Sequence, residues 1–371
     1  MVKICHITSA HDPEDIRIFQ KECISLKENG YDVYLVEQGN SYVKNGVHII
    51  GVGFPSGGRL SRMTTFARKT YRAALDVDAD IYHLHDPELL VYALKLKRKG
   101  KKVIFDSHEK YSEQLKRKPY LPNWCSRMIA AMYTHFEKYV LKKIDGLIFP
   151  SLRNGVHPFE GMCRHITTVN NVPRLEELYD RYDPSAVKKP NSIVYIGGLS
   201  HPRGITSLVK AAGIANCTVY LGGAFSPPSY EDDLKRLPEF SCVCHLGQLS
   251  RPQVLETTQS CLIGYSASLF AGQYNKDDNL ATKAYECMSL GLPVILTCSP
   301  YNKKITKQYE FGICVDPSNP EEIAAAIQYL LKNPEEARRM GENGRRAIKE
   351  EFNWGVEEQK LFALYEDILK D

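Results

Sequence analysis

The sequence lacks the features of an exported or membrane-spanning protein. Nowhere in its 371 residues is there an uncharged apolar run of about 18, the length that a spanning helix needs. The first residues, MVKICHITSAHDPED, contain no apolar stretch followed by a small-residue cleavage site. We therefore expect a cytoplasmic chain with neither a secretory signal nor a transmembrane segment.

The eleven cysteines give no sign of a disulfide framework or a zinc site. Their number is odd and no CxxC pair occurs, whereas zinc sites use closely spaced ligand pairs. Five of them lie in apolar, strand-like segments, where a free thiol behaves as a small hydrophobe: Cys5, Cys217, Cys261, Cys298 and Cys314. We expect buried free thiols and no bound metal.

A dinucleotide-binding fingerprint is also missing, because no GxGxxG motif follows any strand-like segment. This disfavours a dinucleotide-dependent oxidoreductase. The composition, with 43% hydrophobic and 25% charged residues, is that of a folded protein with packed cores. At about 150 residues per domain, the length predicts two domains.

The net charge of +4 hides an asymmetry between the two halves of the chain. Residues 1–190 contain 30 Lys and Arg against 22 Asp and Glu, whereas residues 191–371 contain 18 against 22. The basic first half is suited to an anionic partner such as a phospholipid surface or a phosphate-bearing substrate. The alternative is that each basic cluster is an ordinary solvated helix face.

Short apolar segments alternate with amphipathic ones on both sides of a polar, proline-bearing stretch. The strand-like segments cover residues 3–8, 32–37, 47–52, 81–85, 102–107, 146–151, 166–171, 192–198, 218–223, 243–247, 261–266, 293–297 and 312–316. Such alternation predicts parallel sheets with helices on both faces. We expect an α/β protein of two doubly wound, Rossmann-like domains that face each other across a cleft, with ligands bound after the strands. The boundaries are placed at 1–173, a linker at 174–191, and 192–351.

Three loops that follow strands of the first domain each carry a histidine beside a carboxylate. Histidine titrates near neutral pH, and a neighbouring carboxylate orients it, so these loops are candidates for acid–base or charge-stabilising chemistry. The alternative is a structural histidine that is hydrogen-bonded within each loop. The polar residues of these loops are His11, Asp12, Asp15, Arg17, His85, Asp86, His108 and Glu109.

The second domain has the pattern of a phosphate and sugar-hydroxyl binder. Gly197 and Gly198 let a ligand approach the backbone, and Arg203 supplies a positive charge before a helix. A second helix is predicted from about residue 281 to 290, and its first amides, at Leu280, Ala281 and Thr282, suit a phosphate. Lys283 adds charge there, and Glu286, one turn further on, can accept hydrogen bonds from a ribose diol.

At these residues the sequence resembles the retaining nucleotide-sugar glycosyltransferases of family 4, which have the GT-B fold. The resemblance covers nearly the whole chain. It runs through HDPEDIRIFQKE, HLHDPELL, FDSHEKY, YIGGLSHPRG, TKAYECMSLGLPVI, GICVDPSNPEEIAAAI and the FNW-containing tail. It implies an acceptor-binding first lobe, a donor-binding second lobe, and a C-terminal helix, residues 352–371, that returns to pack on the first lobe.

The resemblance also implies roles for individual residues. The family's pair of glutamates spaced by eight maps to Asp278 and Glu286, with Glu286 on the ribose and the shorter Asp278 at the sugar. The family's phosphate-binding Arg and Lys map to Gly198 and Arg203, so one cation is missing and Lys283 is the candidate to replace it. His108 matches the histidine near the anomeric centre, with Glu109 beside it. The family requires no metal, so no cofactor is expected.

We therefore expect a retaining hexosyltransferase that uses a nucleoside diphosphate sugar and acts on a hydroxyl of a glycan or polyprenyl-linked acceptor in cell-surface polysaccharide synthesis. No nucleic acid partner is expected. One alternative is a nucleotide-sugar epimerase of the same two-lobed architecture, which needs no acceptor. Another is a non-catalytic two-lobed protein that binds a nucleotide sugar.

A segment of the first half also suggests peripheral contact with an anionic membrane, at the inner face. The stretch KRKPYLPNW combines cations with two aromatic rings, which favour the headgroup region, and an apolar helical stripe follows it. The alternative is that the stripe packs on the domain's own core. The residues concerned are Lys116, Arg117, Lys118, Tyr120, Trp124, Arg127, Met128, Ile129 and Met132.

Overall fold

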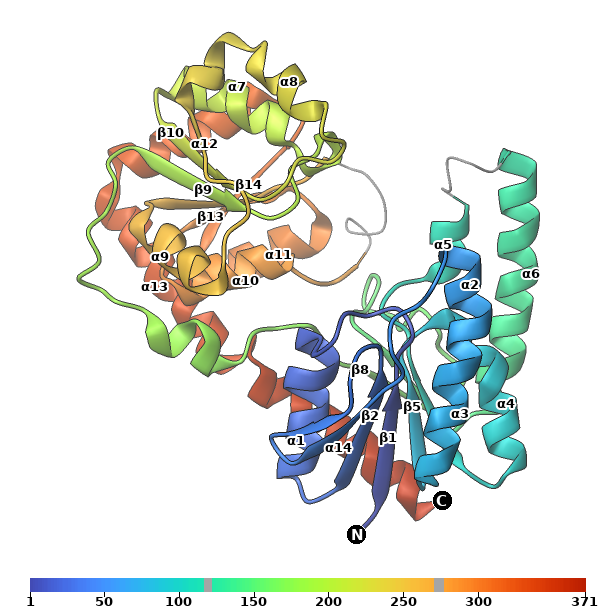
Figure 1. Cartoon of the computed structure of the whole chain (residues 1–371). Helices are drawn as coiled ribbons and strands as arrows, with labels where there is room; N and C mark the ends of the chain where they lie inside the picture. The colour runs from blue at the N-terminus through green and yellow to red at the C-terminus, as the bar shows by residue number, and fades with distance from the viewer. Residues whose placement is uncertain (117–121, 270–276) are drawn as a thin grey trace. The chain divides into compact units, whose positions relative to one another are not determined.

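The contacts of the chain divide it into two compact units, each built on its own sheet (Figure 1). The computed structural model describes residues 1–116, 122–269 and 277–371. The first unit comprises Met1–Asn171 and Glu357–Asp371, and the second comprises Val172–Val356. The polar stretch that follows residue 171 therefore belongs, by its contacts, to the second unit.

The first unit contains an eight-stranded sheet in the order β3-β4-β2-β1-β5-β6-β7-β8. The pairs are parallel except for β3 and β4, which are antiparallel. The strands are β1 (Lys3–Ile7), β2 (Asp32–Glu37), β3 (Tyr42–Lys44), β4 (Val47–Gly51), β5 (Ile81–Leu84), β6 (Lys102–Asp106), β7 (Gly146–Phe149) and β8 (His165–Thr168). Apart from β3 each is a predicted apolar segment, and β3 escapes prediction because all three of its side chains are exposed.

The second unit contains a six-stranded parallel sheet in the order β11-β10-β9-β12-β13-β14. Its strands are β9 (Ser192–Ile196), β10 (Thr218–Gly222), β11 (Val243–His245), β12 (Ile263–Ser266), β13 (Val294–Thr297) and β14 (Gly312–Val315). All six fall within predicted segments, and helices follow most of them. The prediction of two Rossmann-like α/β domains is confirmed.

Helices cover both sheets. Those of the first unit are the π-helix η1 (Ile16–Cys23), α1 (Ile24–Glu28), α2 (Arg59–Ser61), the π-helix η2 (Arg62–Phe66), α3 (Ala67–Val77), the 3-10 turn η3 (Pro87–Leu89), α4 (Leu90–Arg98), α5 (Tyr111–Leu115) and α6 (Asn123–Leu141). Those of the second are the 3-10 turns η4 (Leu175–Glu177), η5 (Tyr179–Arg181), η6 (His201–Arg203) and η7 (Pro238–Cys242), with α7 (Ile205–Ala215), α8 (Tyr230–Lys235), α9 (Arg251–Ser260), α10 (Thr282–Ser289), α11 (Pro300–Tyr309), α12 (Pro320–Lys332) and α13 (Pro334–Glu350). The last helix, α14 (Trp354–Lys370), contributes all but its first residues to the first unit. None of the helices in the described ranges is long and apolar enough to cross a membrane.

The two faces of the first sheet bury different kinds of side chain. Cys5 of β1 and Tyr82 of β5 point into an apolar core that also contains residues of α3 and α4. Because side chains alternate along a strand, His6 and His83 point to the opposite face. There they meet Tyr365 of α14. The first unit therefore has an apolar face and a face with a buried polar centre.

Candidate functional site

The carboxyl ends of three adjacent strands bring the histidine loops of the first unit together. Strand β1 pairs with β5, and β5 pairs with β6, so the loops after Ile7, Leu84 and Asp106 lie side by side. The rings of His11 and His108, from the first and third of these loops, have centroids 4.7 Å apart. The sequence analysis places these histidines after strands of one domain, and in the structure the three loops are neighbours within the first unit.

His11 and Asp86 form an ion pair in this cluster. His11 Nδ1 lies 3.2 Å from Asp86 Oδ1, and the buried carboxylate also accepts a hydrogen bond from the backbone N–H of Ser9 at 2.6 Å. Burial opposes the charged form of His11, but the hydrogen bond and charge of Asp86 outweigh it and raise the pKa of His11. Burial likewise opposes ionisation of Asp86, yet its bonds to His11 and Ser9 hold its pKa well below the usual range. These contacts therefore favour the charged form of both His11 and Asp86.

His108 is supported by a carboxylate that the sequence analysis did not single out. His108 Nε2 lies 3.2 Å from Asp106 Oδ2, and its side chain is 23% exposed whereas that of Asp106 is fully buried. Arg17 donates from Nε to the same Asp106 oxygen at 2.9 Å. Burial disfavours a charged Asp106, but Arg17 and then His108 keep its pKa well below the ordinary value. A buried, ionised carboxylate thus orients an imidazole that reaches solvent.

The remaining residues predicted in this lobe have different surroundings. Asp15 caps η1 by accepting hydrogen bonds from the backbone N–H groups of Arg17 and Ile18, at 2.8 and 3.0 Å. Asp12 is exposed and accepts from Gln38 at 3.4 Å. The Glu109 carboxylate accepts a hydrogen bond from Gln114 of α5. The geometry supports a local structural role for Asp15 and turns Glu109 toward a neighbouring helix.

Behind His108, a buried polar centre extends into the sheet. His85 Nδ1 lies 3.3 Å from His108 Nε2, and His85 Nε2 lies 2.9 Å from His6 Nδ1. Burial lowers the pKa of His85 to about 4 and those of His6 and His83 well below the ordinary value. Only His85 of these three was predicted. His83 has one signal, the H-x-H spacing with His85, which places two imidazoles on the same side of the strand, whereas His6 is a single polar residue in an apolar strand and has none.

The second unit places its predicted cation beside the glycine turn. Lys283 Nζ donates to the Tyr195 hydroxyl at 3.1 Å, and a Cβ built on Gly197 would lie 3.6 Å from the same nitrogen. Burial, followed by the positive charge of Arg203, lowers the pKa of Lys283 to about 8. Lys283 and Arg203 are thus close enough for their positive charges to repel each other, and two neighbouring cations suit an anionic ligand.

Glycine is required at this turn for conformational and steric reasons. Gly197 has φ of +145°, which side chains rarely adopt. Gly223, after β10, has φ of +135°, and a Cβ there would lie 2.0 Å from the Gly197 carbonyl oxygen. Among the described residues, none lies within 4 Å of a Cβ built on Gly198, and this position is exposed. The turn after β9 leaves its backbone accessible to a ligand.

The start of α10 carries the other donor-lobe residues. Ala281 is its N-cap, so the first amides, at Thr282 and Lys283, have no acceptor within the helix. The backbone N–H of Leu280, just before it, is 3.4 Å from the Tyr285 hydroxyl. Asp278 is partly buried before the helix. The amides at the start of a helix carry a partial positive charge, and the phosphate contact expected there from the sequence stays a prediction.

Glu286 is held by a partner that the sequence analysis did not identify. Arg251 of α9 donates from one guanidinium nitrogen to Glu286 Oε1 at 2.6 Å, and its other terminal nitrogen lies 3.4 Å from Glu177 Oε2. The side chain of Glu286 is 18% exposed, so part of it reaches the surface. Arg251 therefore fixes the carboxylate at the position where the resemblance expects a ribose.

Comparisons with known proteins agree with this arrangement. Residues 180–347 match the family Glycosyl transferases group 1, and residues 22–153 match Glycosyltransferase Family 4. Over 90 residues the chain is 30% identical to MMP alpha-(1->4)-mannosyltransferase of Mycolicibacterium hassiacum, a match covering 24% of this chain and 22% of that protein. The sucrose-phosphate synthase of Thermosynechococcus elongatus covers 100% of both chains with a TM-score of 0.80 at 17% identity. Anabaena HepE in complex with UDP-glucose covers 99% of this chain and 100% of its own, with a TM-score of 0.71 at 13% identity.

The two Rossmann-like units and these matches define a glycosyltransferase of the GT-B type. Within that class, the chain belongs to the family 4-like glycosyltransferases, as the sequence motifs predict.

Proposed function

We propose that the protein is a retaining hexosyltransferase that moves a sugar from a nucleoside diphosphate sugar to a hydroxyl of a glycan or polyprenyl-linked acceptor, in cell-surface polysaccharide synthesis. The observation that carries the donor class is the placement of Lys283 and Arg203 beside the Gly197 turn and the start of α10. The mannosyltransferase relative and the UDP-glucose complex of HepE support the same class.

In this proposal the second unit binds the donor diphosphate through fixed positive charge. Two side-chain cations and the helix amides neutralise the charge that develops on the leaving diphosphate. These groups supply the positive charge that a divalent cation supplies in a metal-dependent transfer, so the transfer step needs no added metal. Gly197 and Gly198 let the diphosphate approach the backbone, Glu286 accepts hydrogen bonds from the ribose, and Asp278 contacts the sugar.

The first unit supplies the group that acts at the anomeric centre. His108, oriented by buried Asp106, stabilises positive charge at the sugar as the glycosidic bond breaks. His11 is the candidate to bind an acceptor hydroxyl, because its ring is partly exposed near that of His108 and is paired with the buried carboxylate of Asp86.

A panel of nucleotide sugars tests the donor class. A true donor raises the unfolding temperature, because it binds only the native state. Product analysis with that donor, with and without acceptor, then separates the alternatives. A new glycosidic linkage that forms only with acceptor supports transfer, an epimerised nucleotide sugar from donor alone indicates an epimerase, and binding without any product indicates a binding protein.

Turnover in EDTA that rises on addition of Mg²⁺ or Mn²⁺ would contradict the metal-free transfer step.

We expect Glu286→Gln to weaken binding of a ribonucleoside diphosphate about tenfold while affecting its 2′,3′-dideoxy analogue much less. The amide keeps the shape but loses the charged acceptor for the ribose hydroxyls, an effect of about 1.5 kcal/mol. Calorimetry with both ligands measures the difference. Equal weakening of the two ligands would instead indicate that Glu286 serves to hold Arg251.

We also propose peripheral contact of the first unit with an anionic membrane, through α6. Trp124, Met128 and Met132, spaced by four, are 69%, 50% and 66% exposed, so this stripe does not pack on the core. Arg127, on the same helix, is exposed, and so is Lys116 at the end of α5. Exposed apolar and cationic side chains on one helix are the pattern of an interfacial helix. Arg117, Lys118 and Tyr120, which the sequence analysis included in this surface, lie outside the described residues.

Co-sedimentation with liposomes of graded anionic lipid content tests this contact. Each basic residue near an anionic surface contributes on the order of 1 kcal/mol, so Lys116→Glu combined with Arg127→Glu should lower the bound fraction at least about tenfold at low salt. The control for net charge is Lys210→Glu combined with Lys235→Glu, at exposed lysines on α7 and α8 of the second unit, which changes the charge by the same amount. Binding that is unchanged in the double variant, or absent at every lipid composition, would refute the proposal.

A further inference from the structure

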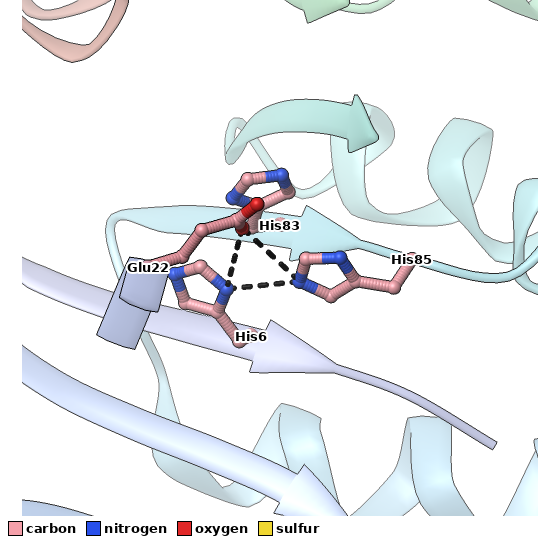
Figure 2. A group of neighbouring side chains, drawn as sticks. All are labelled: His6, Glu22, His83 and His85. Carbon is pink, nitrogen blue, oxygen red and sulfur yellow. Dashed lines mark hydrogen bonds and ion pairs between the residues drawn. The ribbon is translucent and has the colours of Figure 1, made fainter. Parts of the chain in front are cut away.

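Four side chains with metal-binding groups meet in the interior of the first unit. His6 comes from β1, His83 and His85 from the end of β5, and Glu22 from η1 (Figure 2). Glu22, His6 and His83 are 0% exposed, and His85 is 2% exposed. One ligand atom from each lies within 4.8 Å of the other three. Such convergence of three imidazoles and a carboxylate has no role in the proposed transfer of a sugar, apart from the contact of His85 with His108.

The distances among three of these groups match a metal site. His6 Nδ1 lies 2.9 Å from His85 Nε2, and Glu22 Oε2 lies 3.9 Å from each of these nitrogens. The centre of that triangle is about 2.1 Å from all three atoms, which is the length of a bond from zinc to imidazole nitrogen or carboxylate oxygen. The dashed lines of Figure 2 draw this triangle, and His83 lies beside it.

The far nitrogen of each imidazole has a partner that would fix the ring as a ligand. Tyr365 OH lies 2.8 Å from His83 Nδ1 and 3.4 Å from His6 Nε2. His85 Nδ1 lies 3.6 Å from Asp106 Oδ2. Ligand histidines in proteins are held in this way by a second layer of polar groups. The other nitrogen of His83, Nε2, is buried and has no hydrogen-bond partner among the residues that the structure describes.

Hydrogen bonding alone leaves the cluster incompletely satisfied. An N–H of one imidazole can donate to the other across the 2.9 Å between His6 and His85. That bond leaves Glu22 Oε2 3.9 Å from both rings. Within the described residues neither Glu22 oxygen has a hydrogen bond of full geometry, although the Asp106 carboxyl lies close enough to share a proton with Glu22, whose pKa is raised by burial and then by Asp106. The ion pair of Glu22 Oε1 with Arg17 at 3.1 Å is shared, since Arg17 also binds Asp106. Buried polar atoms without partners are uncommon in native proteins, and an unseen ion is one explanation for them.

A neighbouring group, His85 with Asp106 and His108, is a weaker candidate. Asp106 Oδ2 already accepts from Arg17 Nε and lies 2.9 Å from a second nitrogen of that guanidinium. His108 is the ring that reaches solvent, and it is the catalytic candidate. The first cluster is therefore the better metal site.

We propose that His6, His83, His85 and Glu22 bind one zinc ion, which holds together β1, β5 and η1. The ligand set is nitrogen and oxygen without thiolate, and its burial excludes water from a fifth position, as in closed structural sites. The sequence analysis excluded a zinc site because the cysteines form no closely spaced pairs. These ligands are histidines and a glutamate from distant parts of the chain, so that reasoning does not apply to them. Bound zinc would also fix His85, whose other nitrogen faces His108.

The test measures metal directly, without donor or acceptor, so its outcome is independent of the proposed transferase activity. Protein purified without a metal-affinity step is depleted with a chelator, incubated with zinc, passed through a desalting column and analysed by mass spectrometry of the metal. We expect one zinc per chain and a raised unfolding temperature. Cobalt in the same site should give the visible absorption of a four-coordinate ion.

Three variants make the result specific to these ligands. Glu22→Gln keeps the volume but removes the anionic ligand, and should weaken zinc binding more than about 100-fold. Tyr365→Phe removes only the hydroxyl that holds two of the rings, and should weaken it about 10- to 100-fold even where Glu22→Gln does not fold. His157→Gln, at a partly buried histidine of the same unit, is the matched control and should retain zinc. No zinc on the wild-type protein, or equal zinc on all variants, which indicates an adventitious ion only, would overturn the proposal.

Discussion

Replacing His108 by alanine should lower turnover by about 100-fold or more while leaving the affinity for the donor nearly unchanged. The imidazole reaches solvent from a buried, ionised Asp106, so it is placed to stabilise charge that exists only as the glycosidic bond breaks. Loss of such a group lowers kcat without weakening ground-state binding. Steady-state kinetics at saturating donor and acceptor, together with calorimetry of donor binding, measure the two quantities separately.

Two further variants show whether the effect belongs to the ring. Asp106→Asn should lower turnover by a smaller factor and alter its pH profile, because Asp106 acts through the imidazole. His157→Gln is the control for loss of a partly buried histidine in the same unit and should keep normal turnover. If turnover survives His108→Ala, the ring is structural, and His11 or His85 becomes the candidate.

Loss of Lys283 or Arg203 should weaken binding of the donor diphosphate by about 10- to 150-fold each, since a hydrogen bond to a charged group contributes about 1.5 to 3 kcal/mol. Each variant is to be titrated with the nucleoside diphosphate in a calorimeter. The control is Lys210→Ala, which removes an exposed lysine of the same unit. Unchanged affinity in both Lys283→Ala and Arg203→Ala would show that the diphosphate does not bind at this position.

The position of Lys283 also predicts a pH dependence of donor binding. Burial and the charge of Arg203 lower the pKa of Lys283 to about 8. The Lys283 side chain is therefore positively charged below that pH and loses its charge as the pH rises through it. The affinity for a diphosphate should therefore be full near pH 7 and fall above pH 8, and bound diphosphate should shift the transition to higher pH. Lys283→Ala should abolish the step, and Lys210→Ala should not. A step that persists in Lys283→Ala would assign it to another group.

Much of the fold is predictable because its strands are nearly continuous apolar segments, as in sheets buried on both faces. The exception, β3, has three exposed residues and pairs antiparallel at the edge, so it carries no apolar pattern. Helix η1 is a π-helix, whose turn is wider than that of an α-helix. That turn buries Arg17 and Glu22, two polar residues that an amphipathic pattern places at the surface.

The candidate site is predictable where polar residues follow strands, and is missed where they lie within them. His6, His83 and Asp106 occupy strand positions, and a single polar residue in an apolar strand is indistinguishable from an ordinary core residue. Their meeting depends on the order β1-β5-β6, which local sequence does not encode. For the same reason Arg251, distant in sequence from Glu286, could be found only from the folded chain.

The discontinuity of the first unit has a consequence for synthesis on the ribosome. Residues 172–356 form one unbroken unit, which can complete its own contacts as soon as that stretch has emerged. The first unit, although most of it is made earlier, needs residues 357–371, which include Tyr365 against His6 and His83. Until then its sheet exposes an unfinished polar face to the cell. The first unit, most of which is translated first, is therefore the unit that completes its fold last.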